Sequence, residues 1–146
     1  IMKKIIVFIL ISVLCLSSFC SCELIEKANE AHAMVRDFVS ALENDNWETA
    51  MTFVHPASGA NAEMLENMVF RFESQCGADF SGVEYVGQVD LYTNSSIGFN
   101  GEKTIKHNVG RTIKIDGKTF ELEAVVIENS AGRGILSFQI KMSVGF

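Results

Sequence analysis

The hydrophobic period of this chain changes once, at Gly77, and that change limits the folds it can adopt. Before Gly77, apolar residues recur every three or four positions, which is typical of amphipathic helices. After Gly77 they alternate with polar residues, which is typical of strands that bury one face. No helical pattern separates the later strands, so neighbouring strands are expected to pair antiparallel. The sequence therefore predicts an α+β fold with its helices first and its sheet second.

Three helices are expected before the sheet. The first spans 24–42 and carries an apolar stripe of Leu24, Ala28, Ala31, Val35, Phe38 and Leu42. Asp45 with Glu48 is typical of a capping pair and predicts a short second helix, which ends at His55-Pro56. The third begins after Asn61 and ends at Gly77. Its predicted buried residues are Met64, Leu65, Met68, Val69 and Phe72.

Turn signals divide the second half of the chain into strands. Asn100-Gly101 and Asp116-Gly117 indicate hairpins, because both central positions of such turns favour positive φ. They enclose a strand over 102–115, in which Gly110 is a candidate bulge. In the last strand, alternation places on one face Leu136, Phe138, Ile140, Met142 and Val144. We expect three N-terminal helices packed on one face of a curved antiparallel sheet of about four to five strands.

The first residues of the chain are typical of an export signal. Lys3 and Lys4 precede an apolar run from Ile5 to Leu16. As a helix, these twelve residues would rise about 18 Å, which is less than the bilayer core of about 30 Å. A secretory signal peptide is therefore expected here rather than a helix that spans a membrane.

The segment ends in Ser21-Cys22, which resembles the lipobox of bacterial lipoproteins, where a small residue precedes the lipidated cysteine. The resemblance implies a signal peptide at 1–21 and a single domain at 22–146. It also implies acylation of Cys22, and hence a lipid anchor in a bacterial cell membrane or envelope. Cys20 is the second candidate acceptor, and an ordinary signal peptide with incidental cysteines is the alternative.

The charge of the chain and its cysteine and histidine residues limit the classes of function that we expect. From Glu23 onward the chain holds 18 acidic and 10 basic residues, so nucleic-acid binding is not expected. The residues from Leu91 onward carry a net charge of +2, which indicates either a solvated basic face or a site for an anionic ligand. After cleavage, Cys76 would be the one cysteine besides Cys22, which excludes a disulfide framework. The histidines are scattered, and neither a metal nor a cofactor is expected.

The helix at 34–42 and the turn after it resemble a known superfamily. The two segments read MVRDFVSAL and, at 45–50, DNWETA. They are similar to the nuclear transport factor 2-like (cystatin-like) superfamily, whose small secreted members open with an apolar helix, an acidic turn, an aromatic residue and alanine. The resemblance implies a sheet that curls around the first helix into a cone with a pocket at its open end. A cystatin-like fold with one helix is the competing architecture.

The long strand supplies the candidate pocket residues. Alternation predicts an inward face of Ile105, His107, Val109, Arg111, Ile113 and Ile115. His107 and Arg111 interrupt this apolar face, and a buried cation without a partner costs several kcal/mol. Arg111 is therefore expected to reach a carboxylate on a helix, which we favour, or else the cone mouth or a ligand. A bulge at Gly110 would instead turn Arg111 outward.

Two functions follow from the resemblance. Ketosteroid isomerases and small dehydratases of the superfamily use a carboxylate or histidine base with a tyrosine or aspartate donor. Tyr85, His107 and Arg111 could supply such a pocket, but Asp90 is expected on the face opposite Tyr85. The incomplete set favours a noncatalytic, membrane-anchored lipoprotein that binds a small ligand, a peptide or a partner protein, with an isomerase or dehydratase as the alternative. A homodimer through the outer sheet face is a further option.

Overall fold

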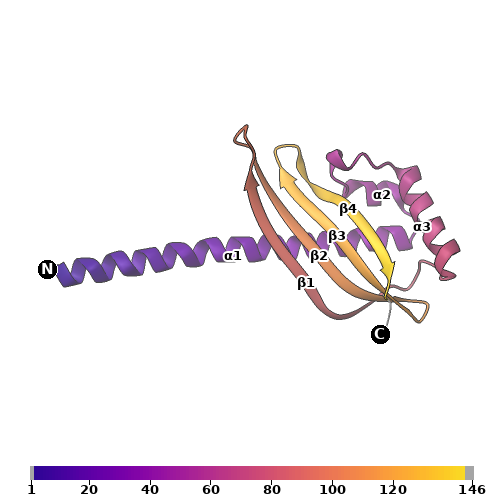
Figure 1. Ribbon diagram of the computed structural model, residues 1–146, viewed down its shortest axis with the longest axis horizontal. Coiled ribbons are helices and arrows are strands. Elements are labelled where there is room, and N and C mark those ends of the chain that lie inside the picture. Colours follow the sequence, from indigo (N-terminus) through magenta and orange to yellow (C-terminus); the bar gives the residue numbers. More distant parts are fainter. Residues whose placement is uncertain (1, 144–146) are drawn as a thin grey trace.

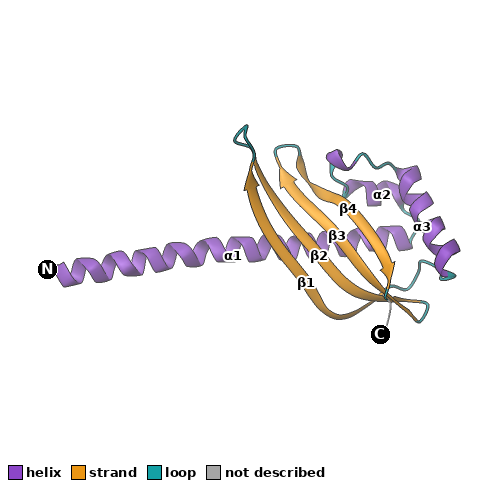
Figure 2. Ribbon diagram, viewed as in Figure 1, coloured by secondary structure: helices purple, strands orange, loops and turns teal. Residues whose placement is uncertain are grey.

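The computed structural model describes residues 2–143, and the side chains of residues 23–143. Val144 and the side chains of Cys20 and Cys22 lie outside this part. Within it, three α-helices precede a four-stranded antiparallel sheet, which confirms the predicted α+β class (Figures 1 and 2). The elements are α1 (Met2–Glu43), α2 (Trp47–Thr52), the 3-10 helix η1 (Pro56–Ser58), α3 (Ala62–Cys76), β1 (Glu84–Ile97), β2 (Lys103–Ile115), β3 (Lys118–Asn129) and β4 (Gly132–Met142).

Helix α1 is longer than predicted, because it begins at Met2 rather than near Leu24. Its C-terminal half crosses the sheet, while its N-terminal half extends beyond it (Figure 1). The predicted apolar stripe is buried from Ala28 to Leu42, whereas Leu24 is 45% exposed. Leu24 precedes Lys27, which contacts Glu128 at the end of β3. Among the described residues, no helix is both long and apolar enough to cross a membrane.

The cap of α2 is Asn46, so the predicted capping pair that begins at Asp45 is wrong. Asp45 has a φ of 52°, and this left-handed conformation ends α1. The Asn46 side chain accepts the backbone N–H of Thr49 at 3.1 Å, which satisfies a free donor of the first turn. Both residue types cap helices well, and the backbone of Asp45 decides between them.

Helix α3 begins and ends where the sequence predicts. The Asn61 side chain accepts the N–H of Met64 at 2.9 Å, and Gly77 closes the helix with a φ of 57°. Leu65 and Val69 are buried, but Met64 is 54% exposed, so its predicted burial is wrong. The apolar residues of α3 therefore extend beyond the side of the helix that packs against the rest of the domain.

His55 is fully buried, and α2, which was predicted to end at His55-Pro56, ends earlier, at Thr52. Its N–H donates to the carbonyl of Ile135 at 2.9 Å, and the N–H of Ile135 donates to the carbonyl of Phe53 at 2.7 Å. This short parallel bridge pairs with the edge of β4 near its start. The ring accepts the N–H of Ala57 at Nδ1, so Nε2 carries the proton and donates to Asn129 Oδ1 at 3.1 Å.

The strands form a meander in the order β1-β2-β3-β4. At the β2–β3 turn, Asp116 and Gly117 have φ values of 51° and 73°, as the hairpin prediction requires. The β2–β3 register is continuous through Gly110, so the predicted bulge there is wrong. The irregularities fall instead between Val86 and Val89 in β1 and at Leu136 in β4. Leu136 therefore loses its predicted place on the inner face, which Ile135 takes.

Helix α1 and the inner face of the sheet enclose the core, to which α2 and α3 add from beside β4 (Figure 1). Phe38 of α1 meets Phe138 of β4 edge to face, with ring centroids 5.0 Å apart. Phe72 of α3 meets Phe120 of β3 at the same centroid distance. These two aromatic contacts join both long described helices to the sheet.

Candidate functional site

Tyr85 and Arg111, both predicted pocket residues, lie together between the sheet and α1. Arg111 faces inward because β2 keeps its alternation through Gly110. Its guanidinium carbon lies 5.1 Å from the centroid of the Tyr85 ring, and the guanidinium carbon of Arg36 on α1 lies 5.4 Å from it. Two cations therefore contact one aromatic ring, an arrangement that cation–π attraction favours.

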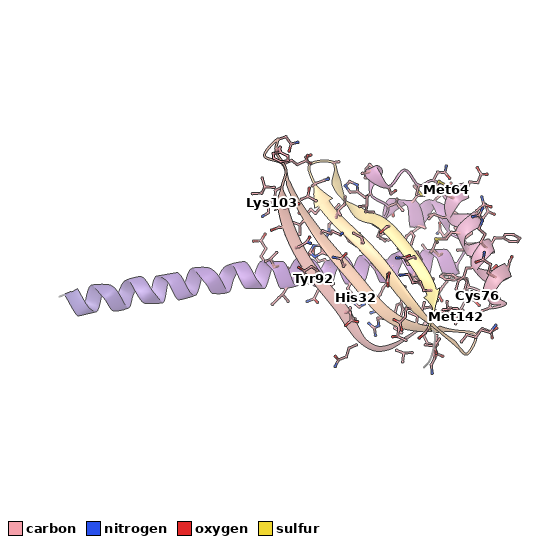
Figure 3. The ribbon with its side chains drawn as sticks, viewed as in Figure 1. His32, Met64, Cys76, Tyr92, Lys103 and Met142 are labelled. Atoms are coloured by element: carbon pink, nitrogen blue, oxygen red, sulfur yellow. The ribbon has the colours of Figure 1, made fainter. Side chains whose placement is uncertain are left out.

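Arg111 is held by a histidine rather than by the expected carboxylate. Its Nη1 donates to Nε2 of His32 at 3.3 Å, and none of the four ion pairs in the described part of the chain includes it. Burial, aided by the charge of Arg111, lowers the pKa of His32. A neutral His32 can accept this hydrogen bond, so the favoured acid pairing is wrong. His32 lies behind the sheet in Figure 3.

The Tyr85 hydroxyl is buried and has no hydrogen-bond partner among the described residues. Burial, as the largest influence, raises the pKa of Tyr85 to about 12. The hydroxyl therefore stays protonated at neutral pH. A buried donor without a partner is rare in native structures, and here the ring contacts of the two guanidinium groups hold the side chain in place.

His107 lies apart from this pair. It is fully buried, and its Nδ1 shares a hydrogen bond of 2.7 Å with Thr93 Oγ1. Burial, followed by the charge of Arg133, lowers the pKa of His107, and its Nε2 has no partner among the described residues. Along β2, His107 is six residues from Ile113, the register partner of Tyr85, which corresponds to about 20 Å.

The predicted trio is therefore divided, with Tyr85 and Arg111 at one place and His107 at another. The isomerase or dehydratase alternative needs Tyr85 and His107 to face one substrate, and the sheet register does not bring them together. Asp90 pairs with Gly110 and is exposed on the outer face, as predicted. Among the described residues, Tyr85, His107 and Asp90 therefore do not surround one common space, as the isomerase or dehydratase alternative would require.

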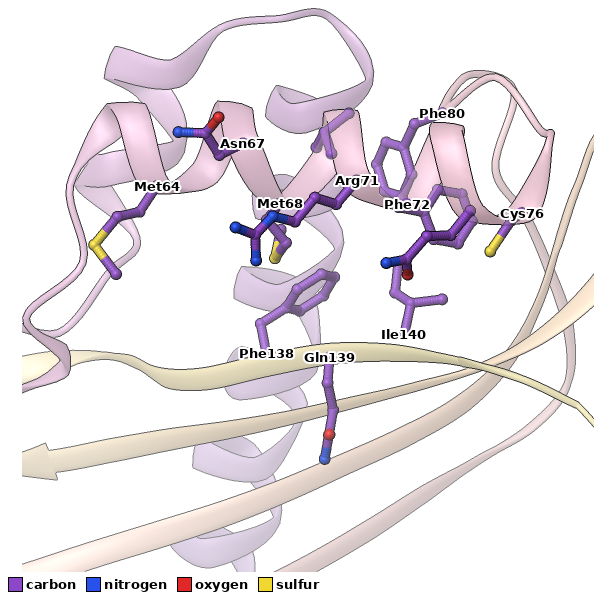
Figure 4. Close-up of a pocket in the computed structure, with 12 residues that line it drawn as sticks. Met64, Asn67, Met68, Arg71, Phe72, Cys76, Phe80, Phe138, Gln139 and Ile140 are labelled. Carbon is purple, nitrogen blue, oxygen red and sulfur yellow. The ribbon is translucent and has the colours of Figure 1, made fainter.

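A groove lies between α3 and β4, which the sequence did not predict (Figure 4). Its volume is about 520 Å³, within the range of small-molecule sites. Its apolar walls are made by Met64, Met68, Val69, Phe72, Cys76, Phe80, Phe138 and Ile140. Cys76, the last residue of α3, is half-buried in this wall.

Polar side chains border the groove at a few positions. They are Asn67, Arg71, Gln75 and Gln139. Arg71 is exposed, belongs to none of the ion pairs in the described part, and is drawn above Phe138 in Figure 4. An apolar trough with one free cation at its border suits a ligand that is largely apolar and carries an anionic group.

The groove also borders an open edge of the sheet. In the described part of the chain, strand β4 pairs with β3 on one side, and the bridge to Phe53 and His55 covers its other side only near Ile135. The sequence signal for the groove was the pair Met64 and Met68, one turn apart on α3. The spacing of these residues correctly predicted a helix. Spacing alone does not distinguish a methionine that faces the core from one that lines a groove.

The outer face of the sheet carries polar side chains that bond to one another. Glu123 accepts hydrogen bonds from Gln139 at 2.8 Å and Lys141 at 2.7 Å, and the hydroxyl of Thr112 donates to Glu121. This pattern leaves the homodimer a prediction. In the described part of the chain, no three histidine, cysteine or acidic side chains gather as metal ligands.

No known family model, curated protein sequence or solved structure matches this chain.

Proposed function

We propose that this chain is a noncatalytic lipoprotein of the bacterial cell envelope, anchored through acylated Cys22, and that it binds a small apolar ligand with an anionic group in the groove between α3 and β4. The groove carries the proposal, because it combines a volume of about 520 Å³ with apolar walls and an arginine that belongs to no ion pair among the described residues. Each methylene that a ligand buries there contributes about 0.8 kcal/mol.

The anchor is supported by the sequence at the start of the chain. Lys3 and Lys4 precede a short apolar run, and Ser21-Cys22 has the small residue and cysteine of a lipobox. Intact mass of the chain isolated from bacterial membranes tests this. We expect cleavage before Cys22 and a diacylglyceryl adduct, both lost in Cys22→Ser and kept in Cys20→Ser. A full-length, unmodified chain would contradict the anchor.

The ligand class is supported by what borders the groove. Methionine and phenylalanine side chains offer a polarisable apolar wall that adapts to ligand shape. Arg71 can pair with a carboxylate, sulfonate or phosphate, and it has no competing acid among its described contacts. A peptide along the open edge of β4 is the other occupant that the experiment below can reveal.

The apolar sulfonate 1-anilinonaphthalene-8-sulfonate is a suitable probe for this site. We expect its fluorescence to rise when it binds the folded chain, with a Kd about fivefold weaker in Met64→Gln and in Arg71→Gln, or about 1 kcal/mol each. Both residues are exposed enough to be replaced without disturbing the core. Met142→Gln, 58% exposed and outside the groove, is the matched control.

Equal affinity in all three variants would contradict binding in the groove. Circular dichroism and a thermal melt of each variant separate a lost site from a lost fold, because partly unfolded chains also bind this dye. A competition with short apolar peptides then distinguishes a small-molecule groove from a peptide site on β4.

We also propose membership of the nuclear transport factor 2-like superfamily and its cone shape. The support is the order of elements, three helices and then a curved antiparallel meander, together with the helix and turn at 34–50. In that arrangement, the space between α1 and the sheet is the cone interior, and Tyr85 and Arg111 border it. An experimental structure with a flat, open sheet would contradict the cone.

A further inference from the structure

Three chain segments meet at the end of the domain where α1 leaves the sheet. Lys27 of α1 bonds to Glu128 near the end of β3 at 3.2 Å. Arg133 of β4 donates to the carbonyl of Lys27 at 2.9 Å and also pairs with Glu30. These contacts fix α1 to the β3–β4 turn, just after the position of the proposed anchor.

The β1–β2 hairpin is fixed to the same place. Glu102, at the end of this hairpin, accepts the hydroxyl of Ser130 at 2.5 Å and its N–H at 3.3 Å. The Asn100 side chain accepts the N–H of Glu102 at 3.1 Å, which closes the hairpin loop. The hairpin end, the β3–β4 turn and α1 are therefore one braced unit, and Lys103 marks the hairpin in Figure 3.

This braced end exposes large apolar side chains on both sides of the polar contacts. Phe99 is fully exposed and Ile97 is 74% exposed on the hairpin, while Leu24 and Ile25 are exposed on α1. We call Leu24, Ile25, Ile97 and Phe99 the anchor-side tip. All four side chains remain exposed in the folded domain. Their transfer from water into an apolar environment would be favourable in free energy.

If Cys22 is acylated, the anchor-side tip lies beside the membrane. Cys22 lies five residues before Lys27 in the continuous helix α1, which is about 7.5 Å along the helix axis. The acyl chains would hold the start of the domain at the bilayer surface, and the hairpin braced to Lys27 would lie at the same level. With Cys22 acylated, the bilayer is therefore an apolar environment within reach of Phe99.

We propose that the anchor-side tip rests on the lipid bilayer, with Phe99 and Ile97 in the headgroup and upper acyl region. The proposal depends on the lipid anchor proposed above. We expect its contact to be mainly apolar, because Lys27 is paired with Glu128 and Arg133 with Glu30. Lys103 on the hairpin belongs to none of the four ion pairs in the described part, so uncharged phosphatidylcholine vesicles are used in the test. The contact also orients the domain, since α3 and its groove lie near the end of α1 that points away from Cys22 (Figure 1).

The test is tryptophan quenching by brominated lipid in the full chain, isolated from bacterial membranes and reconstituted into phosphatidylcholine vesicles. The single tryptophan is first removed by Trp47→Phe, and a new one is placed by Phe99→Trp or, as a second position, Ile97→Trp. The matched control is Phe70→Trp, because Phe70 is exposed on α3 beyond the tip. All three positions are exposed, so the fold tolerates the exchanges, and circular dichroism checks that it does.

We expect quenching at positions 99 and 97 at least threefold stronger than at position 70, with a blue-shifted emission. Weak quenching at all three positions, in a chain that is acylated and floats with the vesicles, overturns the tip contact and leaves the anchor intact. Equal strong quenching at all three positions also overturns it, because the domain then has no fixed orientation. A chain that carries no acyl group and does not float overturns the anchor and the tip contact together.

Discussion

Arg111 and Tyr85 face each other beneath α1, with the guanidinium carbon 5.1 Å from the ring centroid. The contact joins β2 to β1, and His32 and Arg36 of α1 complete it from above. Because no carboxylate pairs with Arg111 in the described part of the chain, an aromatic ring and a neutral histidine stabilise this cation.

Tyr85→Phe should leave the free energy of unfolding within about 0.5 kcal/mol of the wild type, or raise it, because the buried hydroxyl has no partner to lose. Tyr85→Leu should cost about 2 kcal/mol, since it removes the ring that both guanidinium groups contact. Urea unfolding of the three proteins measures this. A large loss in Tyr85→Phe would mean that the hydroxyl is bonded.

Two glycines, Gly110 in β2 and Gly134 in β4, should respond very differently to alanine. A Cβ at Gly134 would lie 2.6 Å from the backbone nitrogen of His55, so Gly134→Ala must push two backbone segments apart. We expect it to cost about 3 kcal/mol. Gly110→Ala would only approach Asp90 Cβ at 3.4 Å and should cost less than about 1 kcal/mol. Similar thermal melts for both variants would contradict the bridge between Phe53–His55 and β4.

Buried His55 should be coupled to Asn129. Its Nε2–H donates to Asn129 Oδ1, so His55→Ala or Asn129→Ala should each cost about 1–3 kcal/mol. The double variant should cost less than the sum of the two by about 1 kcal/mol. A double-mutant cycle from urea unfolding gives this coupling. Strict additivity would show that the hydrogen bond does not stabilise the fold.

Acid should destabilise the domain through its two other histidines. Burial lowers the pKa of His32 and of His107 below the ordinary value of about 6.5. The unfolded chain therefore takes up protons first as the pH falls, and stability that is complete above about pH 6.5 declines through the lowered pKa values. Urea midpoints between pH 7.5 and 5 measure the slope, which should flatten in His107→Gln. A midpoint that rises as the pH falls would reverse the sign of this linkage.

The inward face of β2 could be predicted because alternation has a period of two wherever the register is unbroken. His107, Arg111 and their apolar neighbours follow it in the structure. The positions of the bulges could not be predicted this way. Gly87 and Gly110 read alike in sequence, but only Gly87 has a positive φ, of 71°, at an interrupted register.

The contacts of the candidate site depend on how α1 crosses the sheet, and sequence pattern does not encode that crossing. It brings His32, rather than an acid, to Arg111. The groove escaped prediction for a related reason. Met64, Met68 and Phe72 share the helical period of buried Leu65, and the packing of α3 beside β4 decides which of these residues line the groove.

Methyl NMR of the methionines tests the central claim, that the groove between α3 and β4 binds an apolar anion. Met64 and Met68 line the groove, whereas Met34 and Met142 lie outside its lining. During a titration with 1-anilinonaphthalene-8-sulfonate, we predict saturable shifts of the Met64 and Met68 methyl signals and little change at Met34 and Met142. Shifts at Met34 or Met142 with unmoved Met64 and Met68 signals would contradict it.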